Sequence, residues 1–271
     1  MIDTERPSPA PASTAWRGPK AGASPSPPAV PSLEGQVVVI TGGSRGLGAA
    51  TAQVLGEAGM RVVIADIDLH RAQDRAAMLG ERGLAVAAMC LDVTDPEACR
   101  RVVKATVGEF GQLDVLVNNA AVDVTAPLAE LSIEAWQRVL GTNLSGPLMM
   151  TKYATASMLR QPSGGHVVNI ASTASKRAWP NACAYHATKW GLLGLSHALH
   201  AELRERHIRV SAIVAGGMKT PFLLDRFPDI DESRLQDPVN VARAVLYVLQ
   251  QPEGTVIPEL MVLPRLESSW P

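Results

Sequence analysis

Three side chains in the sequence could together move a proton to or from a substrate oxygen: Ser172, Tyr185 and Lys189. Tyr185 and Lys189 are four residues apart (189 − 185 = 4), which places both on one face of a helix. An ammonium group one turn from a phenol favours the phenolate, so we expect the Tyr185 pKa to lie below its usual value of about 10. Ser172 closes the strand-like run 166–171 and could bind the same oxygen. This Tyr–Lys spacing also arises by chance, so its meaning depends on the surrounding elements.

Short apolar runs alternate with helical patterns from residue 33 onward, and these elements must position the three side chains. Runs such as 37–40, 61–65 and 113–117 are apolar along nearly their whole length, as in parallel strands buried on both faces. The intervening helical stretches predict βα units, with one long helical region over 133–159 broken near Gly141 or Gly146. We therefore expect an α/β fold: a doubly wound, Rossmann-like parallel sheet in a three-layer arrangement.

Composition bounds the remaining possibilities. The chain has 271 residues, a net charge of −1 and 46% hydrophobic residues, which predicts a large core. No basic stripe is present, so nucleic acid is not an expected partner, and no apolar run is long enough to span a membrane. The three cysteines form no CxxC pair, which argues against a metal site or a disulfide framework and favours a cytoplasmic protein.

The chain divides into three parts. Residues 1–32 contain eight prolines among Ala and Ser, which predicts a disordered extension. We expect residues 33–264 to form a single folded domain and residues 265–271 to form a C-terminal tail.

A glycine-rich turn lies between the first strand and the first helix. It reads Thr-Gly-Gly-Ser-Arg-Gly-Leu-Gly over 41–48, and glycines there let the backbone approach a pyrophosphate at a helix N-terminus. Asp66 ends the second strand 18 residues later (66 − 48 = 18), near the offset of a carboxylate that binds an adenosine ribose. Asp66 favours NAD, whereas Arg45 would suit the 2′-phosphate of NADP or be a solvated loop charge; we expect NAD.

Further motifs follow in order: Asn-Asn-Ala-Ala over 118–121, Tyr185-x-x-x-Lys189, and Ala-Gly-Gly-Met-Lys-Thr over 215–220. With the glycine turn, they resemble the TGxxxGxG, NNAG, YxxxK and PGxxxT patterns of the short-chain dehydrogenase/reductase family. The resemblance covers residues 33–264, and it departs from the family at Ala121 and Ala215, which replace Gly and Pro.

The resemblance implies a role for each matching residue. Tyr185 is the general acid/base, Lys189 lowers its pKa and binds the nicotinamide ribose, and Ser172 stabilises charge on the reacting oxygen. Asn143 is the fourth catalytic residue, and its implied role is to hold a water that links Lys189 to solvent. Besides Tyr185 and Lys189, the cofactor-binding residues implied are Thr41, Gly42, Ser44, Arg45, Gly46, Leu47, Gly48, Asp66, Asp92, Val93, Asn119, Ala120, Gly217 and Thr220.

The expected function is therefore hydride transfer between NAD, or NADP, and a small-molecule secondary alcohol or ketone. Two alternatives remain: an NADP-dependent 3-oxoacyl reductase, and a nucleotide-sensing regulator without turnover. The resemblance also implies a homotetramer or homodimer. Val122, Asp123, Trp179 and Asn181 flank the expected substrate pocket, and residues 221–238 fit a lid over it.

Overall fold

The computed structural model describes residues 31–267, so the extension expected over residues 1–32 lies almost wholly outside the described residues. Within them, a parallel sheet has the strand order β3-β2-β1-β4-β5-β6-β7. The strands are β1 (Val37–Thr41), β2 (Arg61–Asp66), β3 (Val86–Cys90), β4 (Val115–Asn118), β5 (Gly165–Ser172), β6 (Ile208–Ala215) and β7 (Glu259–Val262). The order reverses between β1 and β4, and a ligand of such a sheet binds at the strand ends near that point.

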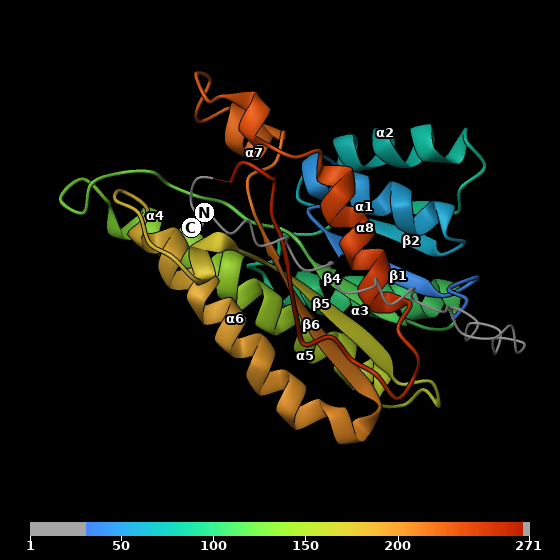
Figure 1. Cartoon of the computed structure of the whole chain (residues 1–271). Coiled ribbons are helices and arrows are strands. Elements are labelled where there is room, and N and C mark those ends of the chain that lie inside the picture. Colours follow the sequence, from blue (N-terminus) through green and yellow to red (C-terminus); the bar gives the residue numbers. More distant parts are fainter. Residues whose placement is uncertain (1–30, 268–271) are drawn as a thin grey trace, which may run out of the picture.

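Helices cover both faces of the sheet, so the predicted three-layer fold is confirmed (Figure 1). They are α1 (Gly46–Glu57), α2 (Leu69–Gly80), α3 (Pro96–Phe110), α4 (Ile133–Leu140), α5 (Gly146–Met158), α6 (Cys183–Leu203), α7 (Pro221–Leu224) and α8 (Pro238–Leu249). None of those within residues 31–267 is long and apolar enough to cross a membrane.

Alternation along the strands builds a separate apolar core on each face. Val38 and Ile40 of β1 pack with α1 and α8, whereas Val39 between them packs on the other side with α3, α5 and α6. Successive side chains of a strand point to opposite faces, so a run that is apolar throughout can supply both cores. This is why the strands read as continuous hydrophobic segments.

The break predicted in the long helical region is a single π-helical turn over Gly141–Ser145, between α4 and α5. Gly146 lies where a Cβ atom would come within 2.9 Å of Val93, so the helix packs closely on the loop after β3. Single π turns are frequent at functional sites. Here the turn carries Asn143, which is buried.

Candidate active site

A cavity of about 720 Å³ lies at the carboxyl ends of the strands. We call the part lined by the glycine turn and Asp66 the nucleotide end, and the part lined by Ser172, Tyr185 and Lys189 the far, or substrate, end. Residues of α7 and the segment after it also line the cavity. One continuous space therefore joins the expected nucleotide and substrate regions.

Backbone geometry and close packing shape the glycine turn. Gly42 and Gly46 have positive φ angles of 63° and 55°, which other residues adopt only with strain. A Cβ atom on Gly48 would lie 2.1 Å from the carbonyl oxygen of Gly42. The first turn of α1 therefore packs directly on the loop, and its free N–H groups form a cradle of the kind that binds a phosphate.

The loop after β4 fixes the glycine turn from the side. The Thr41 hydroxyl oxygen accepts hydrogen bonds from the backbone N–H groups of Asn119 and Ala120, at 3.0 and 3.1 Å. The Asn119 amide donates to the carbonyl oxygens of Thr41 and Gly42, both at 2.9 Å. Asn119 thus holds the turn in shape as well as lining the cavity.

Asp66 ends β2 with its carboxylate at the cavity wall. Its two oxygens accept hydrogen bonds from the backbone N–H groups of Ser44 (3.0 Å) and Asp68 (3.1 Å), which orient the carboxylate and leave lone pairs for a ribose hydroxyl. Arg45, the residue that would suit a 2′-phosphate, forms an ion pair of 3.5 Å with Asp225 just after α7. Arg45 therefore links the glycine turn to the lid segment.

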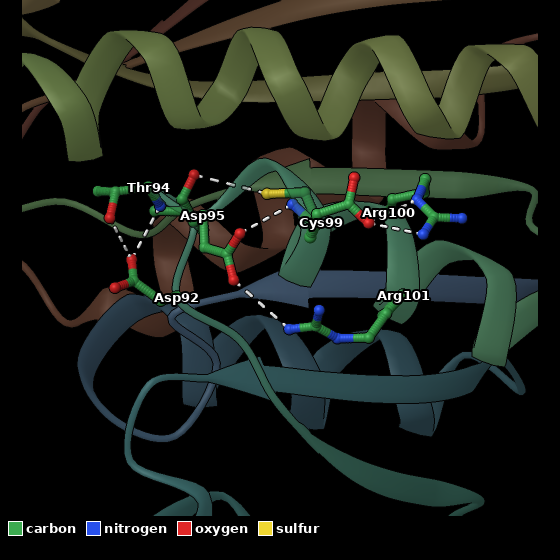
Figure 2. A network of polar contacts seen from close by, with 8 residues as sticks. Asp92, Thr94, Asp95, Cys99, Arg100 and Arg101 are labelled. Carbon is green, nitrogen blue, oxygen red and sulfur yellow. Dashed lines mark hydrogen bonds and ion pairs between the residues drawn. The ribbon is translucent and has the colours of Figure 1, made fainter.

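The loop after β3 is fixed by short polar contacts at the start of α3 (Figure 2). Asp92 accepts hydrogen bonds from the backbone and hydroxyl of Thr94, at 2.8 and 2.7 Å. Asp95 caps α3 by accepting from the Glu97 N–H, and that bond holds the pKa of its carboxyl below the usual value. Cys99 donates to the Val93 carbonyl at 3.5 Å. Asp92 and Val93 are consequently held at the cavity wall.

Tyr185 and Lys189 lie on α6 and face the end of β5. The Lys189 ammonium is 5.6 Å from the centre of the Tyr185 ring and donates a hydrogen bond of 2.7 Å to the Ile170 carbonyl. The Ser172 hydroxyl accepts a hydrogen bond of 3.1 Å from the Ala174 N–H, in a turn that begins directly after β5. The side chains predicted to act together are therefore brought together.

The expected lowering of the Tyr185 pKa is wrong for the protein on its own. Burial raises the pKa of Tyr185 to about 12, against an opposing hydrogen bond from Ser172. Burial also lowers the pKa of Lys189 to about 8. The sequence showed the two charges and their spacing, but not that both groups would lie in the interior, where the desolvation of each outweighs the effect of its neighbour.

Asn143 lies behind the cavity wall and braces it. Its amide donates to the Val122 carbonyl (2.7 Å) and to the Thr188 hydroxyl (3.2 Å), and its oxygen accepts from the Val122 N–H (2.8 Å). Asn143 thus fixes both the loop after β4 and the helix turn next to Lys189. Its water-binding role stays a prediction.

The far end of the cavity holds an ion pair. Arg226 donates from Nη1 to Asp123 Oδ2, and its guanidinium carbon lies 4.2 Å from the centre of the Phe222 ring. The centre of that ring is 5.9 Å from that of Tyr185. Asp123 was expected near the pocket, but Arg226 was missed, because no local pattern marks a lid arginine whose partner is 103 residues away.

Two further residues escaped sequence reasoning. His186 accepts from the Trp179 N–H (3.1 Å) through Nε2 and donates from Nδ1 to the Ala174 carbonyl (3.0 Å), so it fixes the loop between β5 and Tyr185. Glu267 accepts a hydrogen bond of 2.8 Å from the Gly217 N–H. The tail thereby contacts the backbone of a residue expected to bind the cofactor.

Most predicted site residues reach the cavity. The exceptions are Thr41, Gly48 and Asn143, which pack behind its wall. The residues brought to the wall are Gly42, Ser44, Arg45, Gly46, Leu47, Asp66, Asp92, Val93, Asn119, Ala120, Ser172, Tyr185, Lys189, Gly217 and Thr220.

Comparison with known proteins agrees with this geometry. Residues 36–231 match the family model described as short chain dehydrogenase. The chain belongs to this family. The chain is 44% identical to an uncharacterized oxidoreductase of Thermotoga maritima over 188 residues, covering 69% of this chain and 73% of that protein. It is 39% identical to the galactitol 2-dehydrogenase of Agrobacterium fabrum, covering 68% and 71%.

A solved structure extends the match across the fold. A metagenomic short-chain oxidoreductase in complex with NADP superposes with a TM-score of 0.77 at 30% identity, covering 88% of this chain and all of that one. As a member of the short-chain dehydrogenase family, the protein is an oxidoreductase.

Proposed function

We propose that the protein transfers a hydride between a nicotinamide dinucleotide and a secondary alcohol or the matching ketone. The observation that carries this proposal is the single cavity that joins the glycine turn to Tyr185. A protein that only binds a nucleotide would need the glycine turn, whereas only a catalyst needs a buried acid/base such as Tyr185 in the same cavity. The dinucleotide supplies the hydride acceptor or donor.

The residues present fit such a cofactor. Gly42 and Gly46 line the cavity with backbone at the start of α1, and Asp66 offers lone pairs at the end of β2. Asp92 and Val93 would lie along the adenine, and Thr220 and Gly217 near the carboxamide, where Glu267 now holds the Gly217 N–H. NADP is present in the metagenomic relative, but Asp66 would repel a 2′-phosphate, so we propose NAD here.

Tyr185 exchanges the proton of the substrate oxygen. With a pKa of about 12 it is protonated at neutral pH, which suits donation to a ketone oxygen. In the alcohol direction it must accept a proton, and the ammonium of Lys189 on the same helix face then stabilises the phenolate. Ser172 orients the substrate oxygen by hydrogen bonding to it, and Asn143 fixes the loop on the opposite wall.

The substrate is a neutral alcohol in this proposal. Relatives that are 37–39% identical to this chain over the aligned residues are named galactitol 2-dehydrogenase, sorbitol dehydrogenase and D-threitol dehydrogenase. The polar pair at the far end of the cavity is consistent with a substrate that carries hydroxyl groups.

The test is Tyr185→Phe, which removes only the phenolic hydroxyl. We expect kcat/KM to fall about 10²–10⁴-fold, while the dissociation constant for NAD changes less than about threefold. Binding is measured by quenching of tryptophan fluorescence. Unchanged turnover in the variant would refute the mechanism. Tight NAD binding by the wild type without turnover of any alcohol or ketone would instead favour a nucleotide-sensing regulator.

A further inference from the structure

The ion pair at the far end of the cavity joins two segments distant in sequence. Asp123 lies on the loop after β4, and Arg226 follows α7. Arg226 is fixed twice more, because Nε donates to the Phe222 carbonyl at 2.8 Å and the guanidinium lies over the Phe222 ring. The pair therefore joins the loop after β4 to the lid.

Only one of the two oxygens of the Asp123 carboxylate has a hydrogen-bond partner among the described residues. The Asp123 side chain is 8% exposed, and Oδ2 accepts from Arg226. Oδ1 is buried and has no hydrogen-bond partner among the described residues. An unpaired buried acceptor is costly, and a charged carboxylate oxygen more so than a neutral one. A buried acceptor of this kind is normally satisfied by a ligand, an ion or an ordered water.

The charge of Asp123 acts on both Tyr185 and Lys189. Asp123 lines the same cavity as Tyr185, and its negative charge acts to raise the pKa of each, in the case of Lys189 against the larger lowering by burial. Phe222, which carries Arg226 on one side, contacts Tyr185 on the other. Phe222 therefore connects Tyr185 to the Arg226–Asp123 pair through ring contacts.

We propose that Asp123 is a specificity residue that accepts a hydrogen bond from a hydroxyl group on the carbon next to the reacting carbon. The preferred substrate class is then the vicinal diol, as in a sugar alcohol, and a simple secondary alcohol is turned over less well. This inference rests on the proposed alcohol oxidation. Because Oδ1 is shielded from solvent, a small shift of the lid residues must admit the substrate hydroxyl.

A purely structural role for Asp123 makes a different prediction. If the pair only held the lid closed, breaking it from either side would affect a diol and a simple alcohol alike. If Asp123 binds the second hydroxyl, only loss of its carboxylate changes the preference between the two. The ratio of kcat/KM values separates these cases, because a loss common to both substrates cancels.

The experiment compares 2,3-butanediol with 2-butanol, which share a carbon frame and differ by one hydroxyl. The variants are Asp123→Leu, which removes the acceptor at similar volume, and Arg226→Met, which breaks the same ion pair and keeps the acceptor. We expect the wild type to prefer the diol and Asp123→Leu to reduce that preference about 10–100-fold. In Arg226→Met the ratio should stay within about threefold of the wild-type ratio.

Melting temperature and NAD binding show whether each variant is folded. If Asp123→Leu does not fold, Asp123→Asn replaces it, since the neutral amide keeps the shape and accepts a weaker hydrogen bond; the ratio should then fall less but in the same direction. An unchanged ratio in the folded Asp123 variant, or an equal fall in Arg226→Met, overturns the inference and leaves the proposed function standing. Turnover of neither alcohol by the wild type overturns the inferred diol preference, and the proposed alcohol oxidation falls with it if no other alcohol or ketone is turned over.

Discussion

The two ends of the cavity are built in different ways. At the nucleotide end, backbone atoms form the contact surface: the glycine turn is set by positive φ angles at Gly42 and Gly46 and by close packing at Gly48. At the substrate end, side chains form it, and the Asp123–Arg226 pair bridges a core loop and a lid. A backbone surface suits a constant ligand, whereas a side-chain surface can change with the substrate.

The difference also appears in what holds each end in place. The nucleotide end is tied down by hydrogen bonds between Thr41, at the end of β1, and Asn119, directly after the adjacent strand β4. The lid segment, residues 221–238, contains the four-residue helix α7, and its side-chain contacts include Arg45–Asp225 and Asp123–Arg226. We therefore expect changes at the substrate end to alter turnover first, and changes at the nucleotide end to alter binding and stability together.

Lys189→Met gives the largest expected separation between function and stability. Loss of the ammonium beside Tyr185 should lower kcat/KM by about 10²–10⁴-fold. Burial lowers the pKa of Lys189 to about 8, so keeping the charge in the folded state costs on the order of 3 kcal/mol at neutral pH. The variant should consequently melt at a temperature equal to or above that of the wild type.

The pH dependence of the unfolding free energy tests whether the lowered pKa of Lys189 destabilises the wild type. The unfolded state binds more protons than the folded state between about pH 8 and the ordinary lysine pKa of about 10.4, so wild-type stability should rise across that window relative to Lys189→Met. Chemical denaturation at pH 7, 9 and 10.5 measures this difference. Parallel curves for the two proteins would show that the pKa of Lys189 is not lowered by folding.

Gly48→Ala changes the glycine turn at the nucleotide end of the cavity. Its methyl group would lie 2.1 Å from the Gly42 carbonyl, and neither backbone segment can move freely. We expect a loss of about 1–3 kcal/mol in unfolding free energy and about 10–100-fold weaker NAD binding. Gly108→Ala is the matched control, since a Cβ atom there meets nothing within 4 Å on α3. Equal effects in both variants would show that close packing does not shape the turn.

The same contrast explains what the sequence could predict. Local patterns predict the sheet, the glycine turn and the Tyr185–Lys189 face. Each depends on the types of residues that are close together in the sequence, such as apolar runs in strands and glycines at positive φ angles. The break near Gly141 or Gly146 was also predicted, since glycine is a poor helix former, although not that it is a π turn. The interior position of Tyr185, the Arg226 pair and the Glu267 contact depend on residues distant in sequence, and no local pattern records them.

Asp66→Asn should have a smaller and more selective effect. The amide oxygen can still accept from the Ser44 N–H, but the charge that would repel a 2′-phosphate is gone. We expect the ratio of kcat/KM for NAD to that for NADP to fall about tenfold. Asp68→Asn is the control, because it removes a nearby charge and keeps the cap on α2. A ratio unchanged in Asp66→Asn would mean that Asp66 does not set the cofactor preference.

Glu267→Ala should have the smallest effect, and it tests whether the tail belongs to the nucleotide end. The Glu267 carboxylate accepts from the Gly217 N–H and lies where a Cβ on Gly216 would come within 2.6 Å of it, so it covers the strand end next to Thr220. If a bound carboxamide must displace this contact, its removal should tighten NAD binding about two- to fivefold, in keeping with one exchanged hydrogen bond. Titration of both proteins with NAD by fluorescence measures the change. Weaker binding in the variant would instead make Glu267 part of the cofactor site, and the nucleotide end would then also depend on a side chain distant in sequence.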